Sequence, residues 1–255
     1  MPRIDSRSLD ALRPVTMMPG FHSMAEGSVL YRAGKTLVLC TASVEDRVPP
    51  FLEGKGKGWL TAEYQMHPRS NPQRREQRDG RGKAPSGRTQ EIQRLIGRAL
   101  RAAVDLDKLG ERTIALDCDV LEADGGTRTA SVTGGFVALA LAIHKITRSG
   151  TLKNRVLPEP VAAISVGCIK NDELALDLNY VEDSAARVDL NVVGTDSAAI
   201  IEIQGTAEGE AVHRNVIDAM VDLALKGIAD LTTMQKATLQ AAGVELGELL
   251  QEKKK

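Results

Sequence analysis

A pair of glycines between a strand-like run and a helical run is the feature that most limits how this chain can fold. The segment 124–131, Asp-Gly-Gly-Thr-Arg-Thr-Ala-Ser, follows an apolar run that ends at Leu121 and precedes a long helical run through Phe136. Glycine lets the backbone turn tightly and approach a ligand closely. The start of the following helix offers unpaired N–H groups and the positive end of its dipole. Together with nearby hydroxyls and the guanidinium of Arg128, the segment is typical of a phosphate-like anion site. The alternative is an ordinary glycine turn before an N-capped helix.

A second polar feature is an acidic segment that contains Asp183 and Asp189, six positions apart. On a helix they would face different directions, and on one straight strand they would lie about 20 Å apart. Polar residues 182–186 separate two β-like runs, so we expect a hairpin loop that brings both carboxylates to one Mg²⁺ or Mn²⁺. Asp177 is a weaker candidate for the same site. The alternative is that these acids are solvated turn and strand-face residues. An anion site and an acidic cluster in one chain indicate phosphate chemistry assisted by a metal.

Residues 67–88 are the most polar part of the body of the chain, and basic residues outnumber acidic ones there. Prolines and glycines prevent a continuous helix, so we expect a mobile arginine-rich loop over 69–88. A loop of this length is typically functional or disordered; it is either a solvated surface loop or a strip that binds a polyanion such as RNA. Arg88 stands directly before the clearest helical pattern, from about Thr89 to Leu106. It is either an ordinary loop arginine or points at an anion near the helix start.

Composition limits the classes of function. The 255 residues carry a formal net charge of −1, so attraction to nucleic acid must come from a local patch. Aromatic residues make up only 3%, which argues against an extensive platform for stacked bases. P-loop, HExxH and GxSxG motifs are absent from the sequence, and the four histidines show no metal-ligand spacing. The three cysteines lie far apart in apolar runs, so we expect buried free thiols in a reducing compartment.

The expected organisation is one α+β domain over 1–255, because strand-like runs come in clusters separated by single helices. The C-terminal part is expected to hold two helices, over about 208–226 and from about Asp230, followed by a frayed tail over 241–255. The N-terminus lacks the apolar core of a signal peptide. No apolar run approaches the length of about 20 residues that a membrane helix needs. We therefore expect a cytoplasmic protein with no membrane partner.

Several long, ordered motifs resemble the ribonuclease PH family, and the resemblance runs from about residue 3 to 240. They include Ala-Glu-Gly-Ser-Val at 25–29, Cys-Thr-Ala-Ser-Val at 40–44, Gly-Trp-Leu-Thr-Ala-Glu-Tyr at 58–64, and the segments 87–98, 123–131, 182–193 and 204–209. The resemblance implies a ribonuclease PH-like fold of mixed sheets packed with helices. It implies a phosphate-dependent 3′→5′ exoribonuclease (tRNA nucleotidyltransferase) that trims the 3′ ends of tRNA precursors and assembles as a homohexamer, a trimer of dimers.

The resemblance also implies roles for individual residues. Phosphate, the co-substrate, is expected to bind at Arg88, Gly126, Thr127 and Arg128. The catalytic acids that associate with Mg²⁺ or Mn²⁺ are expected to be Asp183 and Asp189. Contacts to RNA and to a neighbouring subunit are expected in the arginine-rich loop, at Arg69, Arg74, Arg75 and Arg78. The sequence departs from the family pattern at Ser6, where glycine is usual, at His67, where leucine is usual, and over 70–73. These departures affect individual loop contacts and not the chemistry.

The leading hypothesis is phosphorolysis of RNA, with inorganic phosphate as nucleophile and nucleoside diphosphates as products. The alternative is a catalytically silent RNA-binding ring or scaffold subunit of the same fold. A silent subunit has no need to keep both acids and both phosphate-binding arginines, and all four are present. A third reading, a phosphate-using enzyme that acts on small nucleosides, leaves the arginine-rich loop unexplained.

Overall fold

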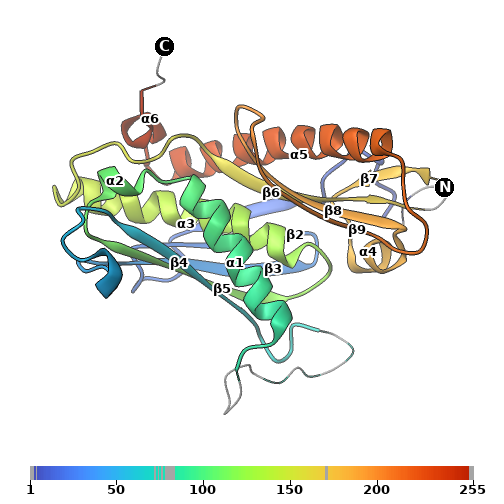
Figure 1. Ribbon diagram of the computed structural model, residues 1–255, viewed down its shortest axis with the longest axis horizontal. Coiled ribbons are helices and arrows are strands. Elements are labelled where there is room, and N and C mark those ends of the chain that lie inside the picture. The colour runs from blue at the N-terminus through green and yellow to red at the C-terminus, as the bar shows by residue number, and fades with distance from the viewer. Residues whose placement is uncertain are drawn as a thin grey trace.

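Two β-sheets enclose a central helix, α3 (Thr127–Arg148), in the computed structural model (Figure 1). The structure describes residues 3, 5–71, 73, 75, 77, 84–169 and 172–252. The first sheet has the strand order β1-β2-β3-β5-β4 and the second has the order β7-β6-β8-β9. The arrangement confirms the α+β class, because the strands gather in two clusters and the helices pack on their faces.

The strands have the following bounds: β1 Val15–Pro19, β2 Gly27–Ala33, β3 Thr36–Glu45, β4 Trp59–Met66, β5 Thr113–Glu122, β6 Val161–Cys168, β7 Leu174–Leu176, β8 Val188–Thr195 and β9 Ile200–Ala207. Besides α3, the helices are α1 Gly87–Ala102, α2 Leu106–Leu109, α4 Tyr180–Ala185, α5 Arg214–Ala241 and α6 Leu246–Leu249, with a 3₁₀ turn at Pro50–Leu52. Strands β1 and β2 pair antiparallel, and β2 and β3 form a hairpin.

Strands β4 and β5 pair in parallel, although the other pairs in both sheets are antiparallel. Parallel neighbours need a crossover connection, and this one contains the arginine-rich loop and α1. The N-terminus of α1 is thereby carried to the end of the sheet where β5 leads into the glycine turn. Ser86 caps α1 by accepting a hydrogen bond from the Thr89 amide at 3.1 Å. The helix therefore begins before Thr89 and ends before Leu106, contrary to expectation, because Asp105 caps the separate helix α2.

Helix α3 forms the middle of the core, with 16 of its 22 residues buried. It lies very close to the first sheet because Gly27 faces it: a Cβ there would be 2.0 Å from the Ala138 carbonyl oxygen. By length and composition α3 could cross a membrane, which corrects the expectation that no run is long enough. However, 83% of its most apolar stretch is buried inside the protein, as in the core helix of a soluble protein. The three cysteines are free and buried, as expected.

Two expectations for the C-terminal part were wrong. Helix α5 continues without a break through Gly227, because this glycine packs against the β7 residue Leu176: a Cβ at Gly227 would be 2.9 Å from that leucine side chain. The end of the chain is docked, at least up to residue 252. Leu249 is buried, Leu250 forms a β-bridge with Leu157, and the Gln251 amide donates to the Leu157 carbonyl at 2.8 Å. Burial of apolar side chains and these hydrogen bonds hold the segment that we expected to fray.

Candidate active site

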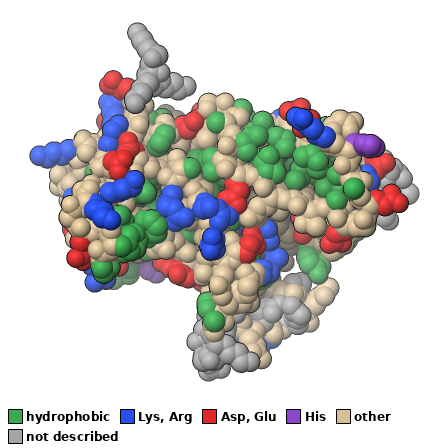
Figure 2. Space-filling view, in the orientation of Figure 1, with side chains coloured by type: hydrophobic (Ala, Val, Ile, Leu, Met, Phe, Trp, Pro, Cys, Tyr) green, Lys and Arg blue, Asp and Glu red, His purple; other side chains and the backbone are tan. Residues whose placement is uncertain are grey.

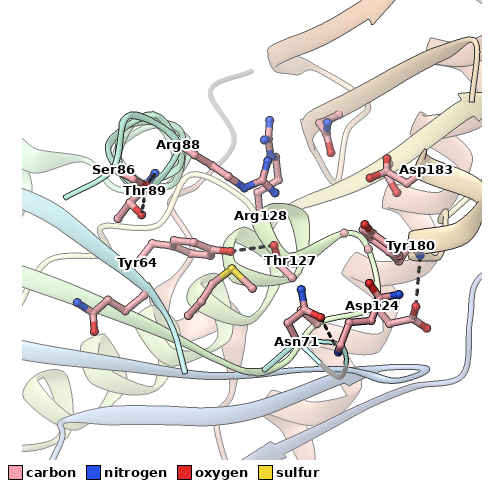
Figure 3. Close-up of a pocket in the computed structure, with 18 of the residues that line it drawn as sticks. Tyr64, Asn71, Ser86, Arg88, Thr89, Asp124, Thr127, Arg128, Tyr180 and Asp183 are labelled. Atoms are coloured by element: carbon pink, nitrogen blue, oxygen red, sulfur yellow. Dashed lines mark hydrogen bonds between the residues drawn. The ribbon is translucent and has the colours of Figure 1, made fainter. Parts of the chain in front are cut away.

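A cavity of about 830 Å³ opens where the ends of the two sheets meet the glycine turn (Figure 3). The expected site residues that line it are Arg75, Arg88, Gly126, Thr127, Arg128, Asp183 and Asp189. These residues come from the crossover loop, α1, the glycine turn, α4 and β8. The structure thus brings together the two features that the sequence singled out, the anion turn and the acidic segment.

The glycine turn has the backbone that the sequence predicted. Gly125 and Gly126 have φ angles of +77° and +64°, in the left-handed region that favours glycine. Gly126 is the N-cap of α3, so no side chain caps the first turn of this helix. The first N–H groups of α3 and the positive end of its dipole are therefore available to an anion in the cavity.

Tyr64 of β4 positions Thr127, the first residue of α3. Their hydroxyl groups lie 2.9 Å apart in a hydrogen bond, and Tyr64 is buried. Burial raises the pKa of Tyr64, against the lowering effect of the Thr127 hydrogen bond and of the Arg88 and Arg128 charges. The tyrosine is therefore neutral and acts as a fixed hydrogen-bonding support beneath the helix start.

Two arginines supply positive charge to the cavity. Figure 3 shows that the side chains of Arg88 and Arg128 extend toward each other from α1 and α3. Arg128 is held by Gln204 of β9, whose side-chain oxygen accepts a hydrogen bond at 3.2 Å, and by Glu91 of α1 in an ion pair at 3.4 Å. Two neighbouring guanidinium groups repel each other unless an anion lies between them, so the arrangement suits phosphate.

The acidic segment differs from the expected hairpin. Residues 180–185 form the short helix α4, and β7 pairs with β6 and not with β8. The helix forms because Asn179 and Glu182 make a capping box, in which each side chain binds the backbone amide of the other residue. Asp183 follows within α4 and Asp189 lies on β8, and both face the cavity. The two carboxylates still meet, but a capped helix brings them together and not a turn.

The electrostatics of the two acids favour a cation between them. Burial in the cavity wall raises the pKa of Asp183, and the charge of Asp189 adds to the effect, while Arg128, Arg88 and Arg13 oppose it. Burial also raises the pKa of Asp189, with Arg128 acting against it. In the part of the chain that the structure describes, no group of three or more His, Cys, Asp or Glu side chains could hold a metal. Two carboxylates, completed by water and phosphate oxygens, are nevertheless the donor set in which Mg²⁺ is commonly bound.

The remaining expected residues have different positions. Asp177 does not join the acidic pair, because it is 2% exposed and both of its oxygens bind Arg13, at 2.6 and 3.0 Å. Arg75 lines the cavity, whereas Arg69 is exposed and is not part of its wall. Arg74 and Arg78 lie outside the described residues.

Sequence reasoning missed several cavity residues. Tyr180, Asn191 and Ser165 line the cavity beside the acids. The signal for Asn191 was present, because residues two apart on a strand share a face and Asn191 follows Asp189 in this way. Ser165 gave no local signal, since it lies on the fully buried strand β6.

Comparisons with known proteins agree with this geometry. Family models match residues 11–144 as domain 1 and 159–227 as domain 2 of the 3′ exoribonuclease family. Ribonuclease PH of Bacillus subtilis and of Bacillus velezensis are each 56% identical over 237 residues, which is 93% of this chain and 96% of theirs. Rice Rrp46 has a similar structure, with a TM-score of 0.76 at 18% identity over 93% of this chain and 100% of that one. The Archaeoglobus fulgidus exosome with RNA bound to the active site gives 0.73 at 20% identity over 91% of both chains. The chain belongs to the RNase PH family of 3′ exoribonucleases.

Proposed function

We propose that this protein is a phosphorolytic 3′→5′ exoribonuclease, a phosphate-dependent tRNA nucleotidyltransferase that trims the 3′ ends of tRNA precursors. The observation that carries the proposal is the single cavity that joins Arg88, Arg128 and the start of α3 to the carboxylates of Asp183 and Asp189. The ribonuclease PH relatives at 55–56% identity support the same activity.

The reaction follows from two anions meeting in this cavity. Inorganic phosphate is held by Arg88, Arg128 and the first amides of α3, and one of its oxygens attacks the phosphorus of the 3′-terminal linkage. The bond from this phosphorus to the 3′ oxygen of the preceding nucleotide breaks, and that oxygen takes up a proton equivalent to the one that the attacking hydrogen phosphate loses. The terminal nucleotide leaves as a nucleoside diphosphate, and the RNA is one nucleotide shorter. No general base is required, because phosphate is already an anionic nucleophile; the protein's main contribution is positioning and charge neutralisation.

The proposal includes a divalent cation, Mg²⁺ or Mn²⁺, held by Asp183 and Asp189. When bound, it would supply positive charge that stabilises the oxygens of the reacting phosphates. The raised pKa values of the two acids support this assignment: burial raises both, the charge of Asp189 adds to the effect at Asp183, and a bound cation would favour the ionised forms.

The proposal also includes RNA contacts in the arginine-rich loop and assembly of a homohexamer, a trimer of dimers, in the cytoplasm. Arg75 in the cavity wall supports a role for the loop, in which Arg69, Arg74 and Arg78 are the other candidates. Figure 2 shows hydrophobic side chains gathered at the surface near α5 and β9, and Ile200 and Ile203 of β9 are 47% and 42% exposed. Such a patch is typical of protein–protein contact. Native mass spectrometry of the purified protein would give the number of subunits.

The test is to incubate a tRNA that carries extra 3′ nucleotides with the protein and Mg²⁺, with and without inorganic phosphate. Nucleoside diphosphates that form only with phosphate are the expected products. Asp183→Asn should lower kcat by about 100-fold or more, whereas Asp222→Asn, at an exposed acid of α5, should not. Nucleoside monophosphates formed without phosphate would show a hydrolase and refute the proposal. Bound RNA without any product would favour the scaffold alternative.

A further inference from the structure

The segment that carries Asp183 is fixed by arginines from the first residues of the chain. Arg3 is 5% exposed, and its guanidinium forms two hydrogen bonds to the Glu182 carboxylate, at 2.6 and 2.8 Å. The same group donates to the carbonyl oxygens of Leu176 at 2.7 Å and Asp177 at 3.1 Å. Arg3 therefore connects α4 to the end of β7 through four hydrogen bonds.

Glu182 has a second task in the same helix. Its carboxylate also accepts the Asn179 amide at 3.1 Å, as part of the capping box. Arg3 Nη2 lies 2.6 Å from a carboxylate oxygen of Glu182 and both side chains are buried, so the pair is a buried salt bridge. Because Asp183 is the next residue, the direction of its carboxylate depends on how Glu182 is held.

Arg13 makes a different connection. Its guanidinium binds both oxygens of Asp177, while its Nη1 donates to the Asp124 carbonyl at 2.7 Å. Asp124 begins the glycine turn, and its carboxylate in turn accepts the Tyr180 amide at 3.3 Å. Arg13 therefore joins the phosphate-binding turn to the acidic segment.

The chain pays a conformational cost to make these contacts. Asp177 has a φ of +55° and Ser6 a φ of +62°, both in the left-handed region that residues with a side chain disfavour. Buried ion pairs add little net stability compared with well-packed apolar residues, because both charges lose their hydration. They do fix geometry, since a guanidinium binds a carboxylate through two directed bonds.

We propose that Arg3 and Arg13 are positioning residues with separate tasks in the active site. Arg3, through Glu182, sets the direction of Asp183 and hence the affinity for the divalent cation. Arg13, through Asp177 and Asp124, sets the spacing between the acidic segment and the phosphate-binding turn. This inference rests on the proposed function of the cavity, and it predicts that the two arginines affect cation and phosphate binding differently.

The test compares four variants of the full-length protein. Glu182→Gln keeps a side chain that can complete the capping box but removes the charge that binds Arg3 and, at 3.8 Å, also pairs with Arg7. Arg3→Lys keeps the charge but loses the two-bond geometry, and Arg13→Lys does the same at the second position. Leu231→Ala is the control, because Leu231 is fully buried where α5 packs on the second sheet and does not line the cavity. It lowers stability without touching either arginine.

Three quantities separate positioning from a loss of stability: Mn²⁺ affinity measured by electron paramagnetic resonance, the KM for phosphate, and kcat. Glu182→Gln and Arg3→Lys should weaken Mn²⁺ binding and lower kcat by about tenfold each, while the KM for phosphate stays within about twofold. Arg13→Lys should weaken Mn²⁺ binding and also raise the KM for phosphate. Leu231→Ala should lower the Tm and leave Mn²⁺ affinity and KM unchanged.

Unchanged Mn²⁺ affinity in both Glu182→Gln and Arg3→Lys, with only a lower Tm, would overturn the inference and leave a purely structural ion pair. Wild-type protein that binds no Mn²⁺ would overturn it as well. Wild-type protein that binds Mn²⁺ but releases no nucleoside diphosphate would refute the proposed function instead. In that case the roles of Arg3 and Arg13 are still tested by the Mn²⁺ affinity of their variants. Failure of this inference and failure of the proposed function are therefore distinguishable.

Discussion

Gly125→Ala tests whether the close contact between the glycine turn and the acidic segment, called the seam below, determines the position of Asp183 in the active site. In the structure, a Cβ at Gly125 would lie 2.7 Å from the Leu178 carbonyl oxygen, 2.8 Å from the Asn179 carbonyl carbon and 2.9 Å from the Tyr180 amide nitrogen. All three are backbone atoms, so a side chain cannot rotate to make room. The substitution should therefore push the start of α4, and Asp183 with it, away from the phosphate-binding turn.

The expected loss of stability has two parts, and a control variant can separate them. Gly125 and Gly150 share a φ of +77°, but nothing lies within 4 Å of a Cβ at Gly150. Both alanine variants incur the cost of a left-handed alanine, about 1–2 kcal/mol. Only Gly125→Ala adds the steric term, about 1–3 kcal/mol by comparison with overpacked cores. At about 2–4 °C per kcal/mol, the Tm of Gly125→Ala should fall about 2–12 °C further than that of Gly150→Ala.

The assays are thermal unfolding and phosphorolysis of a tRNA with extra 3′ nucleotides. A displacement of about 1 Å at a reacting group can cost about 100-fold in rate, so kcat of Gly125→Ala should fall on that order. Gly150→Ala should keep the wild-type kcat, because Gly150 follows the far end of α3. Equal Tm and equal kcat in the two variants would show that the seam is free to relax, and would refute the reasoning.

Other substitutions test the strain, the electrostatics and the cavity wall. Ser6→Gly should raise the Tm by about 1–3 °C, because glycine relieves the left-handed backbone at this exposed residue; a lower Tm would mean that the serine side chain stabilises the segment. Asp183 has a raised pKa in the folded state, so its contribution to stability is present below its ordinary pKa of 3.8 and is lost as the pH rises through the folded value. Asp183→Asn should therefore raise the Tm of the metal-free protein at neutral pH. The increase should be only about 1–3 °C, because solvent screens this accessible group. The increase in Tm should disappear in acid, and an increase that persists at low pH would contradict the electrostatic cause. Tyr180 is 54% exposed in the cavity wall, where its ring can stack on a base of bound RNA. Tyr180→Ala should then raise the KM for RNA about tenfold, while Tyr180→Phe, which keeps the ring, changes it little. Equal effects of the two substitutions would point to the hydroxyl group.

The elements that the sequence predicted well are those set by neighbouring residues. Strand β5, the glycine turn and α3 follow one another along the chain, and each has its own signal in apolar runs, paired glycines and helical spacing. The tight turn predicted from the paired glycines is present, and Gly125 and Gly126 both have positive φ angles. For Arg88 the sequence left two possibilities open, and the structure places it with Arg128 in the wall of the same cavity.

The sequence singled out the two acids that line the cavity, Asp183 and Asp189, but it did not predict the secondary structure that brings them together. The polar run 182–186 resembles a hairpin loop, but the capping box of Asn179 and Glu182 makes it helical. The pattern that distinguishes the two, an Asn followed three positions later by Glu, was present in the sequence and was not weighed. Asp177 was a weaker candidate for the cluster, and sequence spacing could not exclude it because it cannot show that a buried arginine 164 positions away binds this residue.

The link between Arg3 and Glu182 also determines when the site can form during synthesis. Arg3 and Glu182 are separated by 179 positions. At an elongation rate of about 5–20 residues per second, Glu182 is made about 9–36 s after Arg3. The glycine turn, Arg88 and Arg128 are all complete during this interval, while the segment that carries Asp183 does not yet exist. A nascent chain therefore has the residues proposed to bind phosphate before it has the acids proposed to complete the site, and the site can form only when the second half of the protein packs against the first residues made.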